Sequence, residues 1–442
     1  MKQHQFILPL AGAIALTTTQ LPAIGQLVPD NSLGTESSVV VPGQNINGLP
    51  SDRIDGGALR GDNLFHSFQE FNVGDGAGVY FSNPQNVDNI FSRVTGNNIS
   101  NILGTLGVLG NANLFLLNPN GIFFGPNARL DVGGSFFAST ASGILFDGGA
   151  EFAATNSQGE PLLTVNIPVG LQFREAPASI EARGTTLAVP PGETLGLLGG
   201  DLNLQNATLT ATAGRVELGS VGSGLVNLSF GENGFALGYD GGGFPNFQNI
   251  RLAEDTVIDA GGGAIQMQGR QVSVEQSKLR SVTVGSAAGG DISVNASESL
   301  TLTGVGFEEW ERLRERIFDG NVDLATEPGL YGLVGGTQGG GNAGNITVNS
   351  PSLNLASGAV ILNPTFASGA AGNINVNANN IELTGSSISS LTGPGSTGAG
   401  GNIAIATDNL LLRNSSEIFA PTFGGGEGGD ITINAEPPPR PP

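Results

Sequence analysis

The chain has 442 residues, of which 71 are glycine and 39% are hydrophobic, while only 12% carry a charge. So much apolar material excludes a disordered glycine-rich linker, and many glycines with few charges favour short β-strands joined by tight turns. The net charge of −21, with lysine only at Lys2 and Lys278, excludes a protein that binds nucleic acid or an anionic membrane through basic residues.

Residues 1–25 show the order of features of a secretory signal peptide. Lys2 precedes an apolar run from Phe6 to Leu16, and small residues at Ala23 and Gly25 fit the positions that a signal peptidase reads. The apolar run is too short to anchor the chain in a bilayer, so we predict cleavage near Gly25 and an exported chain. A buried N-terminal strand is the alternative.

Residues 26–250 are rich in phenylalanine and contain a conspicuous turn. An apolar strand at 113–117 is followed by Asn118-Pro119-Asn120-Gly121-Ile122 and by a second apolar strand. The proline fixes φ at the turn, the glycine supplies a positive φ, and the two asparagines hydrogen-bond the turn backbone. A well-formed β-turn explains each of these residue types without any further function.

This turn and its flanks resemble the secretion domain of filamentous haemagglutinin-type exoproteins, the passengers of two-partner secretion. The pentapeptide 118–122 is similar to the hallmark of that family, and the resemblance extends to strand 113–117 and to Gly125, Ala128, Val132 and Gly133-Gly134-Ser135-Phe136. The family's upstream Asn-Pro-Asn-Leu motif is degenerate here, where Asn83-Pro84-Gln85-Asn86-Val87 stands. The phrase Arg93-Val94-Thr95-Gly96, with the repeats described below, resembles the multi-repeat versions common in cyanobacteria.

The resemblance implies a route of export. It makes residues 26–250 a secretion domain that caps the fold, with Asn118 to Ile122, Asn83 and Pro84 as residues that a transporter recognises. The transporter would be an outer-membrane β-barrel with periplasmic POTRA domains. The passenger would fold at the cell surface of a Gram-negative bacterium or be released, and would act as an adhesin or a surface-structural protein toward glycans or proteins of a host or neighbouring cell.

Residues 251–436 repeat one pattern, a glycine followed by alternating apolar residues. The aligned glycines are Gly290, Gly344, Gly372, Gly401 and Gly429, with a weaker copy at Gly263, and the last four are spaced by 28, 29 and 28 residues. The alternation predicts strands with one buried face, such as Ile374/Val376 followed by Ile381/Leu383. Such short strands cannot bury an apolar face alone, so we predict stacked copies with about three strands each, in a right-handed parallel β-helix with about 4.8 Å between coils.

Two columns of asparagine or aspartate recur in these copies. The first column follows the aligned glycine, at Asp291, Asn345, Asn373, Asn402 and Asp430. The second lies four residues later, at Asn295, Asn349, Asn377 and Asn434, with Ala406 as the exception. We interpret both as structural ladders at coil corners, where such side chains hydrogen-bond the local backbone and tolerate a left-handed φ. Calcium binding is the alternative, although the glycine-rich nonapeptide calcium repeat is absent.

Two segments depart from the repeat. In residues 307–318 one helical face would carry Phe307, Trp310, Leu313, Arg314 and Ile317. This predicts a short amphipathic helix docked on the wall of the β-helix, with a partner-binding helix as the alternative. The proline-rich tail, residues 437–442, cannot extend a ladder because proline lacks the N–H, so it is predicted to be an extended linker or chain end that leaves the last coil uncapped.

An enzyme is the main competing hypothesis, because β-helices also include polysaccharide lyases and hydrolases that place paired carboxylates or basic residues in a groove. After the predicted cleavage the only histidine is His66, cysteine is absent, and neither a GxSxG motif nor a P-loop is present. We therefore predict no catalytic activity, no cofactor and no metal site. A carbohydrate-active enzyme remains the alternative, with two facing carboxylates in a groove as its sign. A third hypothesis is that this chain is only a secretion module and that the activity lies in residues that follow Pro442.

Overall fold

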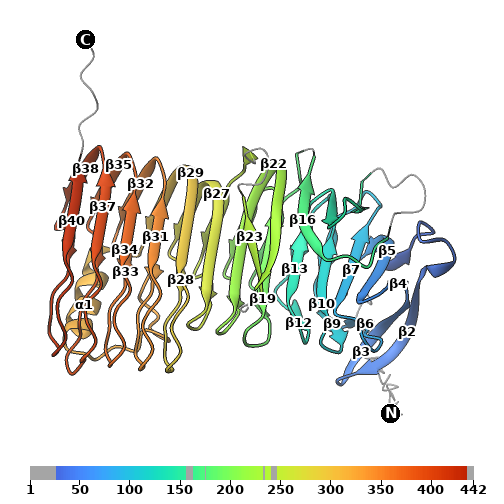
Figure 1. The fold of residues 1–442 in the computed structure, drawn as a ribbon, viewed down its shortest axis with the longest axis horizontal. Coiled ribbons are helices and arrows are strands. Elements are labelled where there is room, and N and C mark those ends of the chain that lie inside the picture. The colour runs from blue at the N-terminus through green and yellow to red at the C-terminus, as the bar shows by residue number, and fades with distance from the viewer. Residues whose placement is uncertain (1–25, 156–162, 175, 232–233, 240–245, 436–442) are drawn as a thin grey trace, which may run out of the picture.

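The structure is a computed structural model that describes residues 26–155, 163–174, 176–231, 234–239 and 246–435. The predicted signal peptide and the proline-rich tail lie outside the described residues. Within the described residues the chain winds into coils that stack along one long axis (Figure 1). Parallel strands form three faces that enclose an apolar interior, so the predicted all-β parallel β-helix is confirmed.

On each face, a strand pairs in parallel with the strands of the coils before and after it. The first face contains β5 (Asn63–Phe71), β7 (Asn89–Val94), β10 (Asn113–Leu117), β13 (Phe136–Ser139), β19 (Thr194–Gly199), β22 (Arg215–Gly231), β27 (Ala264–Glu275), β29 (Ile292–Thr303), β31 (Ile346–Asn349), β34 (Ile374–Asn377), β37 (Ile403–Thr407) and β40 (Ile431–Ala435). The second face contains β8 (Ser100–Ile102), β11 (Ile122–Phe124), β17 (Ile180–Arg183), β20 (Leu202–Gln205), β25 (Ile250–Ala253), the second halves of β27 and β29, β32 (Ser352–Ala356), β35 (Asn380–Thr384) and β38 (Asn409–Arg413).

The third face consists of two sheets in succession. The first contains β3 (Leu49–Gly56), β6 (Gly78–Ser82), β9 (Thr105–Leu109) and β12 (Arg129–Asp131). The second contains β18 (Thr186–Ala188), β21 (Thr208–Thr210), β26 (Val257–Asp259), β28 (Lys278–Arg280), β30 (Gly332–Val334), β33 (Val360–Leu362), β36 (Ser387–Ser389) and β39 (Glu417–Phe419). Each regular coil therefore contributes one strand to each face, as the repeat predicts.

The copies of the sequence repeat lie directly on top of one another. Ile374 pairs with Ile346 in the coil before it and with Ile403 in the coil after it. The weak copy aligned at Gly263 belongs to the same stack, since Ile265 pairs with Ile292. Because the register does not shift between these positions, equivalent apolar side chains point into one interior, and the predicted stacking is confirmed.

The interior is a continuous column of buried apolar side chains. It extends from Ile54 near the N-terminal end to Ile405 in the last coils. Burial contributes about 25 cal/mol per Å² of apolar area, and each coil also pairs the backbone groups of its neighbours. The column crosses residue 250 without a break, so the division into a secretion domain (26–250) and a shaft (251–436) stays a prediction from sequence regularity.

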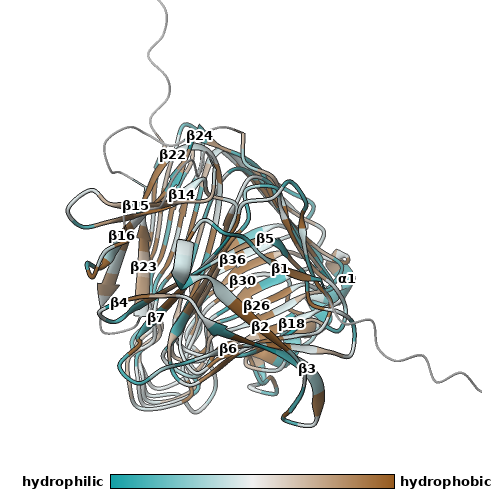
Figure 2. Ribbon diagram, turned by 90° about the vertical axis from the view of Figure 1, so that its right-hand side faces the viewer, coloured by the Kyte–Doolittle hydropathy of each residue, from teal (hydrophilic) through white to brown (hydrophobic). Residues whose placement is uncertain are grey.

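An antiparallel sheet, which we call the flap, covers the outside of the first face in the N-terminal half. It contains β15 (Glu151–Ala153), β14 (Gly143–Phe146), β16 (Pro168–Phe173), the second half of β22, and β23 (Gly234–Gly238), and the short β24 (Asn246–Phe247) pairs with β22 beside it. β22 is 17 residues long because its first half belongs to the first face and its second half to the flap. The first face is therefore covered on both sides where the flap lies, and Figure 2 shows the flap on one side of the stack and the helix on the other.

Four phenylalanines from successive coils stack beneath the flap. Phe65, Phe91, Phe115 and Phe137 occupy equivalent positions, and their successive ring centroids are 5.3, 4.9 and 5.0 Å apart. With apolar residues of the flap they form a second buried cluster, separate from the interior column. The sequence indicated that this half is rich in phenylalanine, but it did not predict that these four rings point outward.

Antiparallel strands cover the N-terminal end of the stack. β1 (Leu27–Pro29) and β4 (Ala58–Arg60) pair with β5, and β2 (Ser38–Ile46) forms a hairpin with β3, with a short 3₁₀ turn at Gly34–Glu36 between β1 and β2. We call β1, β2 and β4 the cap. These strands occupy the edge that a preceding coil would fill. They therefore shield the backbone groups of this edge from pairing with another chain.

His66 is completely buried beneath the cap. Its Nδ1 lies 3.0 Å from the hydroxyl of Ser38 in β2. Burial lowers the pKa of His66 to about 3, although the nearby Asp55 favours the charged form. The imidazole is therefore neutral in the folded protein at every physiological pH.

We expect His66 to make the fold sensitive to acid. The unfolded chain takes up a proton near the ordinary pKa of 6.5, so the contribution of His66 to stability is complete above about pH 6.5 and is lost as the pH falls toward 3. Between about pH 6 and about pH 4 the unfolding free energy of the wild type should fall by about 2 kcal/mol more than that of His66→Gln. Urea denaturation at several pH values measures both slopes, and equal slopes would contradict this origin of acid sensitivity.

The 54-residue interval between two of the aligned glycines contains α1 (Phe307–Phe318), at the bounds that the sequence predicts. The helix packs against the outside of the third face through Trp310, Leu313 and Ile317. Arg314, predicted on the apolar face, instead reaches Glu417 in β39, with 2.9 Å between Nη1 and Oε2. Lys278 in β28 donates from Nζ to the backbone oxygens of Glu327 and Pro328 in the loop after the helix, at 2.8 and 3.0 Å. The predicted docking on the wall is confirmed. In the described part of the chain, no helix has the length and apolar character that crossing a bilayer requires.

Candidate functional site at the turn after β10

The pentapeptide 118–122 forms the corner between the first and second faces. The Gly121 N–H donates to the Asn118 oxygen at 3.1 Å, which closes a β-turn with Pro119 at its second position. Gly121 has a φ of +121°, as the sequence predicts. Ile122 starts β11 and is buried between β8 and β17 of the neighbouring coils. The turn therefore sets the direction in which the chain enters the second face.

The Asn118 side chain is completely buried and fully hydrogen-bonded within the chain. Its Nδ2 donates to the Asn98 backbone oxygen at 3.0 Å and to the Ser100 hydroxyl at 2.9 Å, and its Oδ1 accepts from the Asn120 N–H at 3.0 Å. These contacts join the turn to the preceding coil. A partner of the folded protein cannot touch this side chain.

Asn120 and Pro119 connect the same turn to both neighbouring coils. The Asn120 Nδ2 donates to the Gly96 oxygen in the preceding coil at 2.7 Å, and the Pro119 oxygen accepts from the Ala178 N–H in the following coil at 3.4 Å. Both residues are half-buried. The turn thus contacts three successive coils, and forming it positions the coils on either side.

The exposed part of the turn borders a shallow hollow of 270 Å³ on the second face. Its lining includes Ile99, Asn120, Phe123 and Arg183. Ile99 is 46% exposed beside this turn. From this hollow a partner of the folded domain could reach Asn120 and Gly121.

Asn83 and Pro84 lie at a different corner, between β6 of the third face and β7 of the first face. The Val87 N–H donates to the Pro84 oxygen at 3.2 Å, and Asn86 takes the left-handed position with a φ of +66°. The Asn83 Oδ1 is buried and has no hydrogen-bond partner among the described residues. The structure therefore does not bring the two motifs into one corner, although the turn at 118–122 bonds to residues 96–98, which follow β7. Recognition of either motif by a transporter stays a prediction.

Arg93 connects the cap, the first face and the flap. It is 1% exposed, and it donates to the hydroxyls of Ser67 at 2.9 Å and Ser32 at 2.8 Å and to the Ala153 oxygen in the flap. Its guanidinium lies 4.4 Å from the ring centre of Phe152. Burial lowers the pKa of Arg93 to about 10, against the attraction of Asp30, so it stays charged at neutral pH. The sequence analysis noted residues 93–96 only for their family resemblance. The signal for the structural role of Arg93 was a single arginine within an apolar strand.

A third asparagine ladder, which the sequence analysis missed, marks the start of the first face. Asn89 donates from Nδ2 to the Asn63 Oδ1 at 3.2 Å, and Asn113 donates to the Asn89 Oδ1 at 3.0 Å. Each begins an Asn-(Leu/Ile)-Phe triplet, and these triplets recur after 26 and 24 residues. That spacing was the available signal that the regular coils extend into the N-terminal half.

In the shaft, the first predicted column forms a ladder between coils. The backbone N–H of each member donates to the side-chain oxygen of the preceding member, at 2.7, 3.0, 2.9 and 2.8 Å along Asp291, Asn345, Asn373, Asn402 and Asp430. The interpretation as bonds to the local backbone is wrong, because these side chains bond the backbone of the next coil. The left-handed residues at the corners are others, among them Ser357, Gly385 and Asn414.

The second predicted column is only partly bonded. Asn349 donates from Nδ2 to the Asn295 Oδ1 at 2.8 Å. Asn377 and Asn434 stand on either side of Ala406, and their amides make no hydrogen bond within the described part of the chain. Asn377 is also in register with Asn349, but no hydrogen bond joins their side chains within the described residues, so the bonded part of this ladder ends at Asn349 and Ala406 widens the gap after it.

Buried acidic groups give no sign of a catalytic pair. Burial raises the pKa of Glu217 to about 7, but its carboxylate is unexposed and lies 2.7 Å from the Arg215 guanidinium. Among the described residues, no three histidine or acidic side chains are grouped so that they could hold a metal ion.

Comparison with known proteins agrees with this geometry. The sequence matches the TPS secretion domain family over residues 25–274, more than half of the chain. The solved HMW1 secretion domain from Haemophilus influenzae is similar with a TM-score of 0.54 and 18% identity, over 90% of this chain and 100% of that one. The filamentous hemagglutinin secretion domain gives a TM-score of 0.32 and 15% identity, over 92% and 99%. No curated protein sequence matches the chain. The chain therefore belongs to the TPS secretion domain family and is a two-partner secretion passenger.

Proposed function

We propose that an outer-membrane β-barrel transporter, through periplasmic POTRA domains, recognises the segment around residues 83–122 before it folds. The same residues then form the first stable coils outside the cell. Membership of the family makes the protein a secreted exoprotein of a Gram-negative bacterium. Its display at the cell surface and its action there as an adhesin or surface-structural protein, on glycans or proteins, belong to the proposal.

The observation that carries this proposal is the burial of Asn118. Its amide is reachable while the chain is extended and is enclosed once the neighbouring coils have formed. One residue can therefore act first in recognition and later in folding. Folding would withdraw it from the transporter and release the passenger.

The architecture suits export of an unfolded chain. Each coil pairs only with its neighbours, so folding can proceed coil by coil as residues emerge. The cap and the flap cover the N-terminal coils, so the first part to emerge can become stable before the shaft has crossed. Folding free energy would then favour outward movement.

The test compares secretion and stability in matched variants, with the transporter co-expressed. Asn118→Ala leaves the partners of a buried amide unsatisfied, so it should lower the unfolding free energy by about 3 kcal/mol and reduce secretion by about tenfold. Asn127→Ala removes an exposed amide that bonds Asp75 in an earlier coil, and should change neither secretion nor stability. Secretion is measured by immunoblotting of culture medium, and stability by denaturation of purified protein.

Ser100→Ala separates recognition from folding, because it removes a partner of Asn118 without changing the pentapeptide. If Asn118→Ala loses more secretion than Ser100→Ala at equal loss of stability, the pentapeptide is recognised directly. If secretion follows stability alone in both variants, the recognition role is wrong. Unchanged secretion of Asn118→Ala would overturn the recognition role and the link between folding and secretion.

A further inference from the structure

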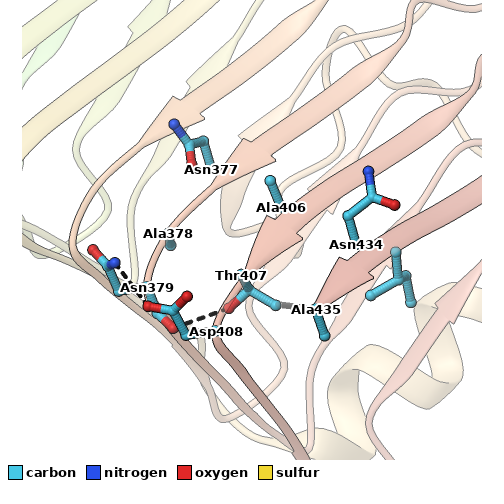
Figure 3. Close-up of a pocket in the computed structure, with 9 residues that line it drawn as sticks. Asn377, Ala378, Asn379, Ala406, Thr407, Asp408, Asn434 and Ala435 are labelled. Atoms are coloured by element: carbon cyan, nitrogen blue, oxygen red, sulfur yellow. Dashed lines mark hydrogen bonds between the residues drawn. The ribbon is translucent and has the colours of Figure 1, made fainter. Parts of the chain in front are cut away.

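A groove lined by asparagines and small side chains runs along the corner between the first and second faces in the last coils. It consists of three hollows of 320, 190 and 730 Å³ that share Asn377 (Figure 3 shows the largest). The groove is dominated by amides from successive coils, those of Asn295, Asn349, Asn375, Asn377, Asn379 and Asn434. No aromatic or basic residue lines the three hollows, and Asp408 is their single charged residue.

The second asparagine column is interrupted within this groove. Ala404 and Ala406 are the two outward residues of β37, and Asn377 in β34 and Asn434 in β40 are in register with Ala406. Strands lie about 4.8 Å apart, so the backbones of β34 and β40 are about 10 Å apart, and the short side chains of Ala404 and Ala406 leave a slot between them. Figure 3 shows Asn377 and Asn434 on either side of Ala406.

The amides that border the slot are free to bind a ligand. In the intact part of the column the Asn349 amide is used in a bond to Asn295. Asn377 and Asn434 are too far apart across Ala406 to bond each other, and each offers two N–H donors and an oxygen with two lone pairs. A ligand that fills the slot can therefore be held from both sides.

The chemistry of the groove selects a neutral, hydroxyl-rich ligand. A net charge of −21 and the absence of basic lining residues disfavour nucleic acids and sulfated polymers. Hydroxyl groups both donate and accept, as amides do, and a polymer can follow the groove across several coils.

We propose that this slot binds a neutral sugar unit of a glycan, held between Asn377 and Asn434 and resting on Ala404 and Ala406. The inference rests on the proposed adhesive function and names its ligand class. Binding would occur without cleavage, because glycosidases need two carboxylates and the groove has only Asp408, which accepts from the Asn379 Nδ2 at 2.9 Å.

The experiment applies the purified, folded protein to an array of neutral, anionic and cationic oligosaccharides, and then titrates the neutral glycan with the strongest signal. Ala406→Asn fills the slot with the residue that the other coils carry there, so it should fold normally and weaken binding by at least about tenfold. Ala356→Asn makes the same exchange on the outer side of β32, outside the groove, and should bind like the wild type. Asn377→Ala with Asn434→Ala removes the free amides and should weaken binding as well.

Each outcome bears on the proposal. Binding of neutral glycans that Ala406→Asn and the double alanine variant both lose supports it. Absence of binding to every neutral glycan, equal binding by Ala406→Asn, or preference for sulfated glycans or protein overturns it. Shortening of the bound glycan would overturn the non-catalytic role. Secretion by the transporter is measured on the same variants, so a failure of this site leaves the export proposal to its own test.

Discussion

Phe115→Ala should lower the unfolding free energy by about 3–5 kcal/mol, one of the two largest effects of a single substitution in this fold. Phe115 is completely buried, outside the interior column, and its ring stacks between those of Phe91 and Phe137 at 4.9 and 5.0 Å. It also contacts Phe235 of the flap, at 5.6 Å between ring centroids. Alanine would leave a cavity that neither the β-helix nor the flap can close, because both sheets are held by backbone hydrogen bonds.

The measurement is thermal and chemical denaturation of the purified protein. Hydrogen exchange of β16 and β23 would show whether the flap opens before the coils. Phe230→Ala is the matched control, since its ring lies at the end of the flap and is 75% exposed. That control should cost less than about 1 kcal/mol. Equal losses in the two variants would show that the stack beneath the flap does not stabilise the domain.

Arg93→Met should have an effect of similar size, about 3–5 kcal/mol, because it removes a buried charge with specific hydrogen bonds. Methionine fills much of the space but cannot donate to Ser32, Ser67 or the Ala153 oxygen. Burial opposes ionisation of Asp30, but hydrogen bonds to Ser32, Thr95 and Ser67 lower its pKa overall, and Asp30 would also lose the attraction of the Arg93 charge. The cap and the flap should then separate from the first face together.

Limited proteolysis with mass spectrometry would detect the separation of the cap and the flap as early cleavage in β1, β2 or β15. Arg60→Met is the control in the same cap, because Arg60 forms a solvent-exposed pair with Glu36 at 2.6 Å. It should cost less than about 1 kcal/mol. If Arg93→Met resists proteolysis as the wild type does, Arg93 fills space and does not join the three elements.

The sequence by itself determined the coils of the shaft. The alternation of apolar residues specifies which face of each strand is buried, and a spacing of 28 or 29 residues specifies which strands stack. Both signals are local or strictly periodic, so no long-range information is needed to interpret them. The same holds for α1, whose helical spacing of apolar residues contradicts the surrounding period of two, and for the turn at 118–122, whose residue types specify its backbone.

Only the tertiary structure decided what lies on the outside of the coils. The flap folds back on the first face, so Phe65, Phe91 and Phe115 are buried outside the interior column, a position that alternation alone assigns to solvent. The role of Arg93 depends on Ser32 and Ala153, which lie about 60 residues away on either side. The side chains of the asparagine column reach the next coil because parallel stacking places each one beside a backbone N–H of its neighbour. In each case the contacting residue belongs to a distant segment whose position depends on the folded chain. No local pattern of residues could therefore predict that contact.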